Sequence, residues 1–186
     1  MEIVVGITGA TGVIYGVRLV ETLKNIENVK VHLVTSEWAK KNIETETPYN
    51  IDYIADLADF NYDYRELGAK ISSGSYMTDG MIILPCSMKT LSSIACGYDD
   101  NLISRCAGVM LKEGRKLVIC PRETPLSPIH IENMMKLSRI GVRILPPMPA
   151  FYNNPSTIDD IINYHVMKVL DQFGIRYNNK NRWQGI

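Results

Sequence analysis

The chain has 186 residues, a formal net charge of zero and 46% apolar residues, a length and composition that suit one domain with a buried core. This balance gives no support for a nucleic-acid coat or for binding to anionic membranes. No stretch reaches the ~20 apolar residues of a membrane span, and the first apolar run is too short for a signal peptide. The four cysteines form no Cys-x-x-Cys pair and no metal-ligand cluster. We therefore expect reduced thiols, no bound metal and a cytoplasmic protein.

Apolar runs alternate with helical patterns along the chain. The runs are predicted to be buried strands: one begins at Ile3, and the others cover 29–35, 81–84, 116–120 and 142–145. Helices are predicted over 13–23, 38–43, about 87–95, 101–113, 129–139 and 156–173. Pro85 and Pro121 are expected to end the strands before them. Residues 44–48 read as an acidic connection, and 51–74 as short strands or loops.

Strands that alternate with helices of this length predict parallel βαβ units. We therefore expect an α/β fold: a three-layer, doubly wound parallel sheet of the Rossmann or flavodoxin type. We expect a single domain over 1–186, of which 174–186 are a C-terminal tail. Ligands of such sheets lie beyond the carboxyl ends of the strands. The segments expected at that edge are 9–11, 35–36, 85–90, 121–123 and 146–152.

Residues 3–16, with the sequence IVVGITGATGVIYG, predict a strand, a tight glycine turn and a helix start. Unpaired N–H groups at a helix start favour a bound anion. A dinucleotide site would favour an acid at the end of the second strand, where this chain has Thr35 and Ser36. The hydroxyls of Ser36 and of 87–90 instead favour a mononucleotide phosphate. Ser87 can equally be a plain helix cap.

Arg122 and Glu123 directly follow a predicted buried strand. An Arg fork can hold a phosphate, and a partly buried Glu suits proton transfer. The alternative is an ion pair without chemistry. His32 and His165 are expected to be structural, and the pair Asp99 and Asp100 to serve as helix cap and dipole partner.

Several motifs in register resemble the UbiX flavin prenyltransferases over nearly the whole chain. They are PCSMKTLS at 85–92, NLI with Arg105 at 101–105, LKE at 111–113, PRETPLS at 121–127, IHIENM at 129–134, PPMPAFY at 146–152, and Arg182-Trp183. The resemblance implies an enzyme that joins a dimethylallyl group from dimethylallyl phosphate to reduced FMN, across N5 and C6. The prenylated FMN would serve a UbiD-type decarboxylase. It also implies a large homo-oligomer, such as a dodecamer.

The same resemblance assigns the site residues. FMN contacts would come from Gly9, Ala10, Thr11, Ser36, Ser87, Met88, Lys89, Thr90 and Arg122. The prenyl phosphate would be held by Tyr152 and Lys168, with charge from Arg105 and Lys112, Glu46 from a neighbouring subunit, and Trp183 closing the site. Glu123 would be the acid or proton relay, and Thr11 and Ser87 complete the expected catalytic group.

Three positions depart from the family pattern. Thr11 stands where Ser is usual, Gly108 where Asp is common, and Lys168 where Arg is frequent. Two other functions are weighed beside the main one. A related FMN-dependent cysteine decarboxylase would carry Pro-Ala-Ser-Ala-Asn-Thr where this chain has Pro-Cys-Ser-Met-Lys-Thr at 85–90. A non-enzymatic FMN carrier would bind the flavin without altering it.

Overall fold

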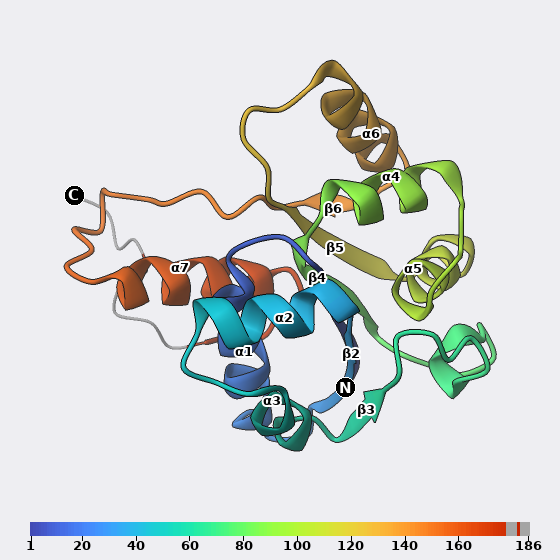
Figure 1. The fold of residues 1–186 in the computed structure, drawn as a ribbon, viewed down its shortest axis with the longest axis horizontal. Coiled ribbons are helices and arrows are strands. Elements are labelled where there is room, and N and C mark those ends of the chain that lie inside the picture. The colour runs from blue at the N-terminus through green and yellow to red at the C-terminus, as the bar shows by residue number, and fades with distance from the viewer. Residues whose placement is uncertain (178–181, 183–186) are drawn as a thin grey trace.

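The computed structural model describes residues 1–177 and Arg182. Its strands form one six-stranded parallel sheet in the order β3-β2-β1-β4-β5-β6. The strands are β1 (Glu2–Ile7), β2 (Lys30–Thr35), β3 (Phe60–Tyr62), β4 (Gly80–Cys86), β5 (Lys116–Pro121) and β6 (Arg143–Ile144). This is the strand order of a Rossmann fold, in which the chain adds strands outward on one side from β1 and then outward on the other side from β4. Figure 1 shows β2 and β3 on one side of the sheet and β5 and β6 on the other. Ligands are expected beyond the carboxyl ends of β1 and β4.

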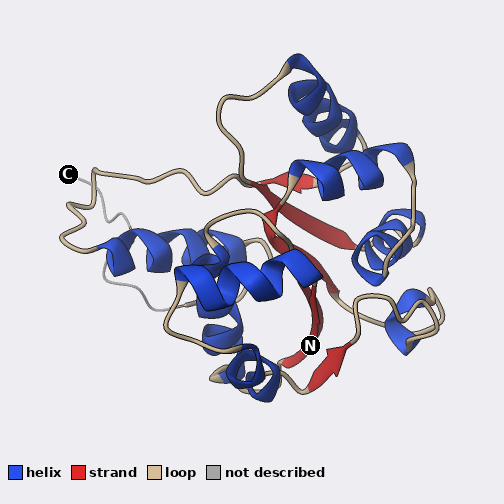
Figure 2. Ribbon diagram, in the orientation of Figure 1, coloured by secondary structure: helices blue, strands red, loops and turns tan. Residues whose placement is uncertain are grey.

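Helices cover both faces of the sheet, so the predicted three layers are confirmed (Figure 2). On one face pack α1 (Val13–Lys24), α2 (Glu37–Glu46), α3 (Ile51–Leu57) and α7 (Ile158–Asp171). On the other face pack α4 (Met88–Cys96), α5 (Leu102–Lys112) and α6 (Pro128–Arg139). Alternate residues of each central strand enter the two cores: Val5 and Ile7 face α1, whereas Val4 faces α5. No helix in the described part of the chain is long and apolar enough to cross a bilayer.

The prediction for the chain between β2 and β4 was partly wrong. Helix α2 continues through the expected acidic connection to Glu46, and α3 lies where short strands or loops were expected. The short strand β3 and the 3₁₀ turn at Lys70–Ser72 complete this region. Helix α3 has two turns, with the Asn50 side chain accepting from the Tyr53 N–H at 2.8 Å and Ile54 as its buried residue. One buried position cannot produce a readable helical period.

The two prolines expected to halt strands are instead the last or next-to-last residues of β4 and β5. Cys86 pairs with Pro121 beyond an irregularity in the ladder. Pro85 lacks an N–H, but its carbonyl accepts from the Thr8 N–H at 3.2 Å and from the Thr8 hydroxyl at 2.8 Å. Proline is tolerated in this central strand because its remaining polar group is satisfied.

The buried His165 in α7 gives the fold a testable pH dependence. Its Nε2 has no hydrogen-bond partner among the described residues, and its ring packs edge-on against Tyr15 at 5.3 Å. Burial lowers the pKa of His165 to about 4. The unfolded chain therefore binds this proton first, so stability falls as the pH drops from about 6.5 to 4, by about 3 kcal/mol. Denaturant titrations between pH 7 and 4 should show a shallower loss for His165→Leu than for the wild type; equal losses would contradict this assignment.

Candidate active site at the carboxyl ends of β1, β4 and β5

The glycine turn between β1 and α1 forms one wall of the site. Gly9 is in close contact with α2, since a Cβ added to it would lie 2.4 Å from the Cβ of Trp38. Gly12 precedes α1 with a φ of 87°, in the left-handed region that favours glycine. Ala10 is buried and Thr11 is exposed. The turn therefore presents backbone amides and the Thr11 hydroxyl, as an anion cradle requires.

Thr8, which sequence reasoning did not single out, joins this wall to the next one. Its hydroxyl donates to the Pro85 carbonyl at 2.8 Å and accepts from the Ser87 N–H at 2.7 Å. The side chain is 2% exposed. One buried hydroxyl therefore ties the end of β1 to the start of α4. A polar residue directly after a buried strand was the only sequence signal that could have indicated it.

Removing the Thr8 hydroxyl should destabilise the protein. In Thr8→Val the partly buried Ser87 amide loses its partner, which should lower the free energy of unfolding by about 1–3 kcal/mol. Chemical denaturation measures this value. Thr8→Ser keeps the hydroxyl and should recover most of the loss. If Thr8→Ser is as unstable as Thr8→Val, the methyl group rather than the hydrogen bonds stabilises this junction.

The start of α4 forms the second wall. The Ser87 hydroxyl accepts from the Thr90 N–H at 3.3 Å and lies 3.1 Å from the Thr90 hydroxyl, so the expected helix cap is confirmed. Met88 is half-buried, and the exposed Lys89 lies 3.7 Å from an Asp100 carboxylate oxygen. Ser36 occupies the equivalent place at α2, where its side chain accepts from the Ala39 N–H. Both serines face helix starts at the carboxyl edge of the sheet.

Arg122 and Glu123 follow β5 at the same edge. The Arg122 N–H donates to the Cys86 carbonyl at 3.1 Å, which places this segment beside the α4 wall. The Arg122 and Glu123 side chains form no ion pair with each other, so the alternative prediction of an ion pair without chemistry is wrong. Glu123 is exposed rather than partly buried, and it accepts from the Thr124 N–H at 2.9 Å. Both groups are thus available to a ligand.

Glu46 lies at the end of α2 and contacts the glycine turn of its own chain. Its carboxylate accepts from the Gly12 N–H at 2.8 Å. A carboxylate at the start of α1 is stabilised by the same unpaired amides that would hold a phosphate. The expected reach of Glu46 into a neighbouring subunit stays a prediction.

Tyr152 and Lys168, both expected at the prenyl phosphate, lie close to Tyr164 and Asp171 of α7. The Tyr152 and Tyr164 hydroxyls share a short hydrogen bond. Burial, with this hydrogen bond second, raises the pKa of Tyr164 to about 12, so the Tyr164 phenol stays protonated near neutral pH. The Lys168 amine lies 3.7 Å from Asp171, which also pairs with Arg182 at 2.7 Å. The group offers hydroxyl donors and cations suited to a phosphate.

Arg105 and Lys112 occupy a separate hollow. Both project from α5 into a pocket of about 500 Å³ that is completed by Ser72, Ser73, Gly74, Ser75 and Glu113. The structure therefore does not unite them with Lys168 within one chain. Trp183 lies outside the described residues.

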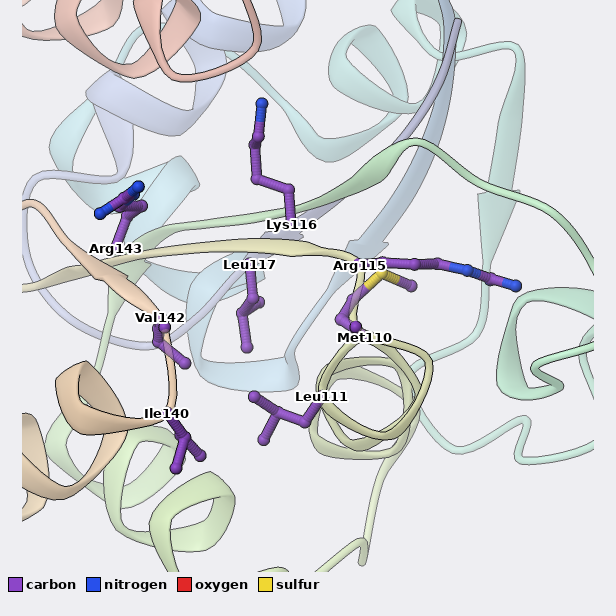
Figure 3. Close-up of a pocket in the computed structure, with 10 residues that line it drawn as sticks. Met110, Leu111, Arg115, Lys116, Leu117, Ile140, Val142 and Arg143 are labelled. Atoms are coloured by element: carbon purple, nitrogen blue, oxygen red, sulfur yellow. The ribbon is translucent and has the colours of Figure 1, made fainter.

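Another hollow, of about 320 Å³, lies at the opposite edge of the sheet, where β5 and β6 begin. Figure 3 shows Leu111, Leu117 and Val142 directed into it, while Arg115 and Lys116 point away. It contains none of the predicted site residues. The described residues contain no cluster of three metal-ligating side chains. Burial raises the pKa of the Cys86 thiol at the end of β4, so this residue is not a thiolate nucleophile.

These strand ends fit a flavin mononucleotide. The start of α4 supplies backbone amides, Gly9 adds no side chain where the turn meets α2, and the Arg122 guanidinium has no side-chain partner among the described residues. An unpaired guanidinium beside helix starts is suited to a phosphate or a ribityl hydroxyl. The site can bind a monoanionic or dianionic phosphate and keep a carboxylate, Glu123, beside it.

Known proteins resemble the chain over its whole length. The Flavoprotein family matches residues 1–170. A probable UbiX-like flavin prenyltransferase from Escherichia coli is 57% identical over 100% of this chain and 94% of its own. A structure described as a dodecameric FMN-dependent UbiX-like decarboxylase from Escherichia coli O157:H7 is 57% identical and superposes over 100% of both chains with a TM-score of 0.98.

A third relative, AnUbiX (PadA1), was solved in complex with FMN and dimethylallyl pyrophosphate. It is 46% identical, and the match covers 100% of this chain and 98% of that one with a TM-score of 0.95. Such identity over full length also confirms the expected fold class. The chain therefore belongs to the Flavoprotein family, within its UbiX-like members.

Proposed function

We propose that this chain is a flavin prenyltransferase that joins the dimethylallyl group of dimethylallyl phosphate to reduced FMN. The observation that carries the proposal is the full-length likeness to a protein solved with FMN and dimethylallyl pyrophosphate. The segments that follow β1, β4 and β5, with Thr11, Ser87 and Arg122, support it, since their polar groups fit a mononucleotide. The motif at 85–90 disfavours the cysteine decarboxylase alternative.

In this proposal the turn at 9–11, Ser36, the α4 start at 87–90 and Arg122 hold FMN. Bound in its reduced form, FMN supplies the electron-rich N5 and C6 atoms that receive the prenyl group. Lys168 and Tyr152 bind the phosphate and stabilise the charge that develops on it as the allylic C–O bond breaks. Glu123 is the acid or proton relay, and it passes on the proton that leaves the flavin as the new bonds form. No metal is required, because fixed cations and hydroxyls neutralise the leaving phosphate.

The separate location of Arg105 and Lys112 supports an assembly in which one copy completes the site of another. The dodecameric relative supports the same arrangement. We further propose that this chain forms a dodecamer, acts in the cytoplasm and passes prenylated FMN to a UbiD-type decarboxylase. Light scattering that returns a monomer mass would contradict the assembly.

Two incubations separate the three candidate functions. Purified protein, reduced FMN and dimethylallyl phosphate are combined, and the mass of the flavin is measured by mass spectrometry. The prenyltransferase adds one prenyl group to FMN. A carrier leaves the flavin mass unchanged. A parallel incubation with oxidised FMN and a peptide that ends in cysteine reports the decarboxylase, which would oxidise the terminal cysteine with loss of CO2 and reduce the FMN.

A further inference from the structure

The Arg105 guanidinium is held on two sides at the rim of its pocket. Its Nε donates to the Ser72 carbonyl at 3.1 Å, and its Nη1 lies 3.4 Å from an Asp99 carboxylate oxygen. An Arg side chain has five N–H donors. Within the described part of the chain the remaining donors have no partner, and Lys112 opens into the same pocket. This leaves a cationic fork free for an anion.

The position of Asp99 depends on the absence of a side chain at Gly108. A Cβ added to Gly108 would lie 3.0 and 3.2 Å from the two Asp99 carboxylate oxygens. Gly108 is three residues beyond Arg105 on α5, so both lie on one side of the helix. The Asp99 carboxylate therefore fills the place that a side chain at 108 would take beside Arg105.

We infer that Asp99 is a positioning residue that holds the Arg105 fork toward the pocket for the phosphate of dimethylallyl phosphate. The inference rests on the proposed function. The Asp99 and Arg105 side chains are 28% and 41% exposed. An ion pair this open contributes little to stability. Its effect is on where Arg105 points, so it acts on phosphate binding.

Asp99→Asn tests the inference directly. The KM for dimethylallyl phosphate should rise about fivefold, the equivalent of an exposed ion pair of about 1 kcal/mol, while kcat and FMN affinity stay within about twofold. Asp159→Asn is the matched control, because it also removes the carboxylate of an Asp–Arg ion pair: Asp159 lies 2.8 Å from Arg18 of α1. It should leave KM unchanged. Equal KM values for wild type and Asp99→Asn would overturn the inference.

Moving the carboxylate provides a second test. Gly108→Asp alone should weaken phosphate binding, since it crowds two carboxylates together. Asp99→Gly with Gly108→Asp should restore the wild-type KM, because residue 108 can then pair with Arg105. Asp99→Gly with Gly108→Ala fills the space without charge and should not restore it. Recovery by the Ala variant would show that filling the space, rather than charge, is what matters, and would overturn the inference.

Calorimetric titration with inorganic phosphate separates this inference from the proposed function. The dissociation constant for phosphate should follow the same order in all variants, without any turnover. If the phosphate affinities of the variants follow this order but the wild type leaves the flavin mass unchanged, the proposed function alone is overturned. Phosphate affinity that is indifferent to Asp99 overturns the inference, whatever the reaction is.

Discussion

Glu123→Gln is expected to bind FMN as tightly as the wild type and to lose turnover by a factor of about 100 or more, because a positioned proton-transfer group contributes that much. The amide keeps the size of the carboxylate and can still accept from the Thr124 N–H, which Glu123 does at 2.9 Å. It cannot take up a proton. Fluorescence titration with FMN and the rate of flavin mass increase measure the two quantities.

Glu132→Gln is the matched control for this change. Glu132 is another exposed Glu, in the first part of α6, and no role is assigned to it. Its replacement should leave turnover unchanged. If Glu123→Gln retains turnover within about twofold, Glu123 is not the proton-transfer group and a different residue must have that role.

Gly9→Ala should weaken FMN binding by about 10- to 100-fold. The added Cβ would meet the Trp38 Cβ at 2.4 Å, far inside van der Waals contact. Either the glycine turn or α2 must move, and overpacking of this kind costs about 1–3 kcal/mol. Since both segments border the proposed FMN site, the cost falls on binding. FMN titration of the purified variant gives the affinity.

Gly68→Ala serves as the control, because nothing lies within 4 Å of a Cβ added there. It should bind FMN normally. A Gly9→Ala variant with normal FMN affinity and lowered thermal stability would show that the turn is rigid for folding rather than for the ligand. Normal values of both would mean that Trp38 moves aside freely.

The fold could be read from the sequence where the period of apolar residues was long. The buried runs became β1, β2, β4 and β5, because parallel strands covered on both faces must be apolar throughout. Helix α3 could not be recognised, since two turns with one buried residue leave no period. The end of β4 was misplaced because the Thr8 contacts that satisfy Pro85 come from 77 residues away.

The site was readable only where it follows strand ends. The turn at 9–11, the start of α4 and the segment after β5 do meet at one edge of the sheet. The separate pocket of Arg105 could not be foreseen, because the motif that contains Arg105 does not tell where its side chain lies relative to the other strand ends. Gly108 seemed to lack an acid; the structure shows the Asp99 carboxylate lying there instead. That pairing is visible only in three dimensions.

The Thr8 bridge has a consequence for how ligands reach the site. The Thr8 hydroxyl, after β1, bonds to both the Pro85 carbonyl and the Ser87 amide at the β4–α4 junction. Moving the loop after β1 away from the loop after β4 would therefore break both bonds together. The two loops therefore form one rigid unit, and the width of the opening between them is fixed before a ligand binds. Entry is expected from the flank, past the exposed side chains of Glu123 and Leu126. A neighbouring copy that covers this flank would then control ligand entry.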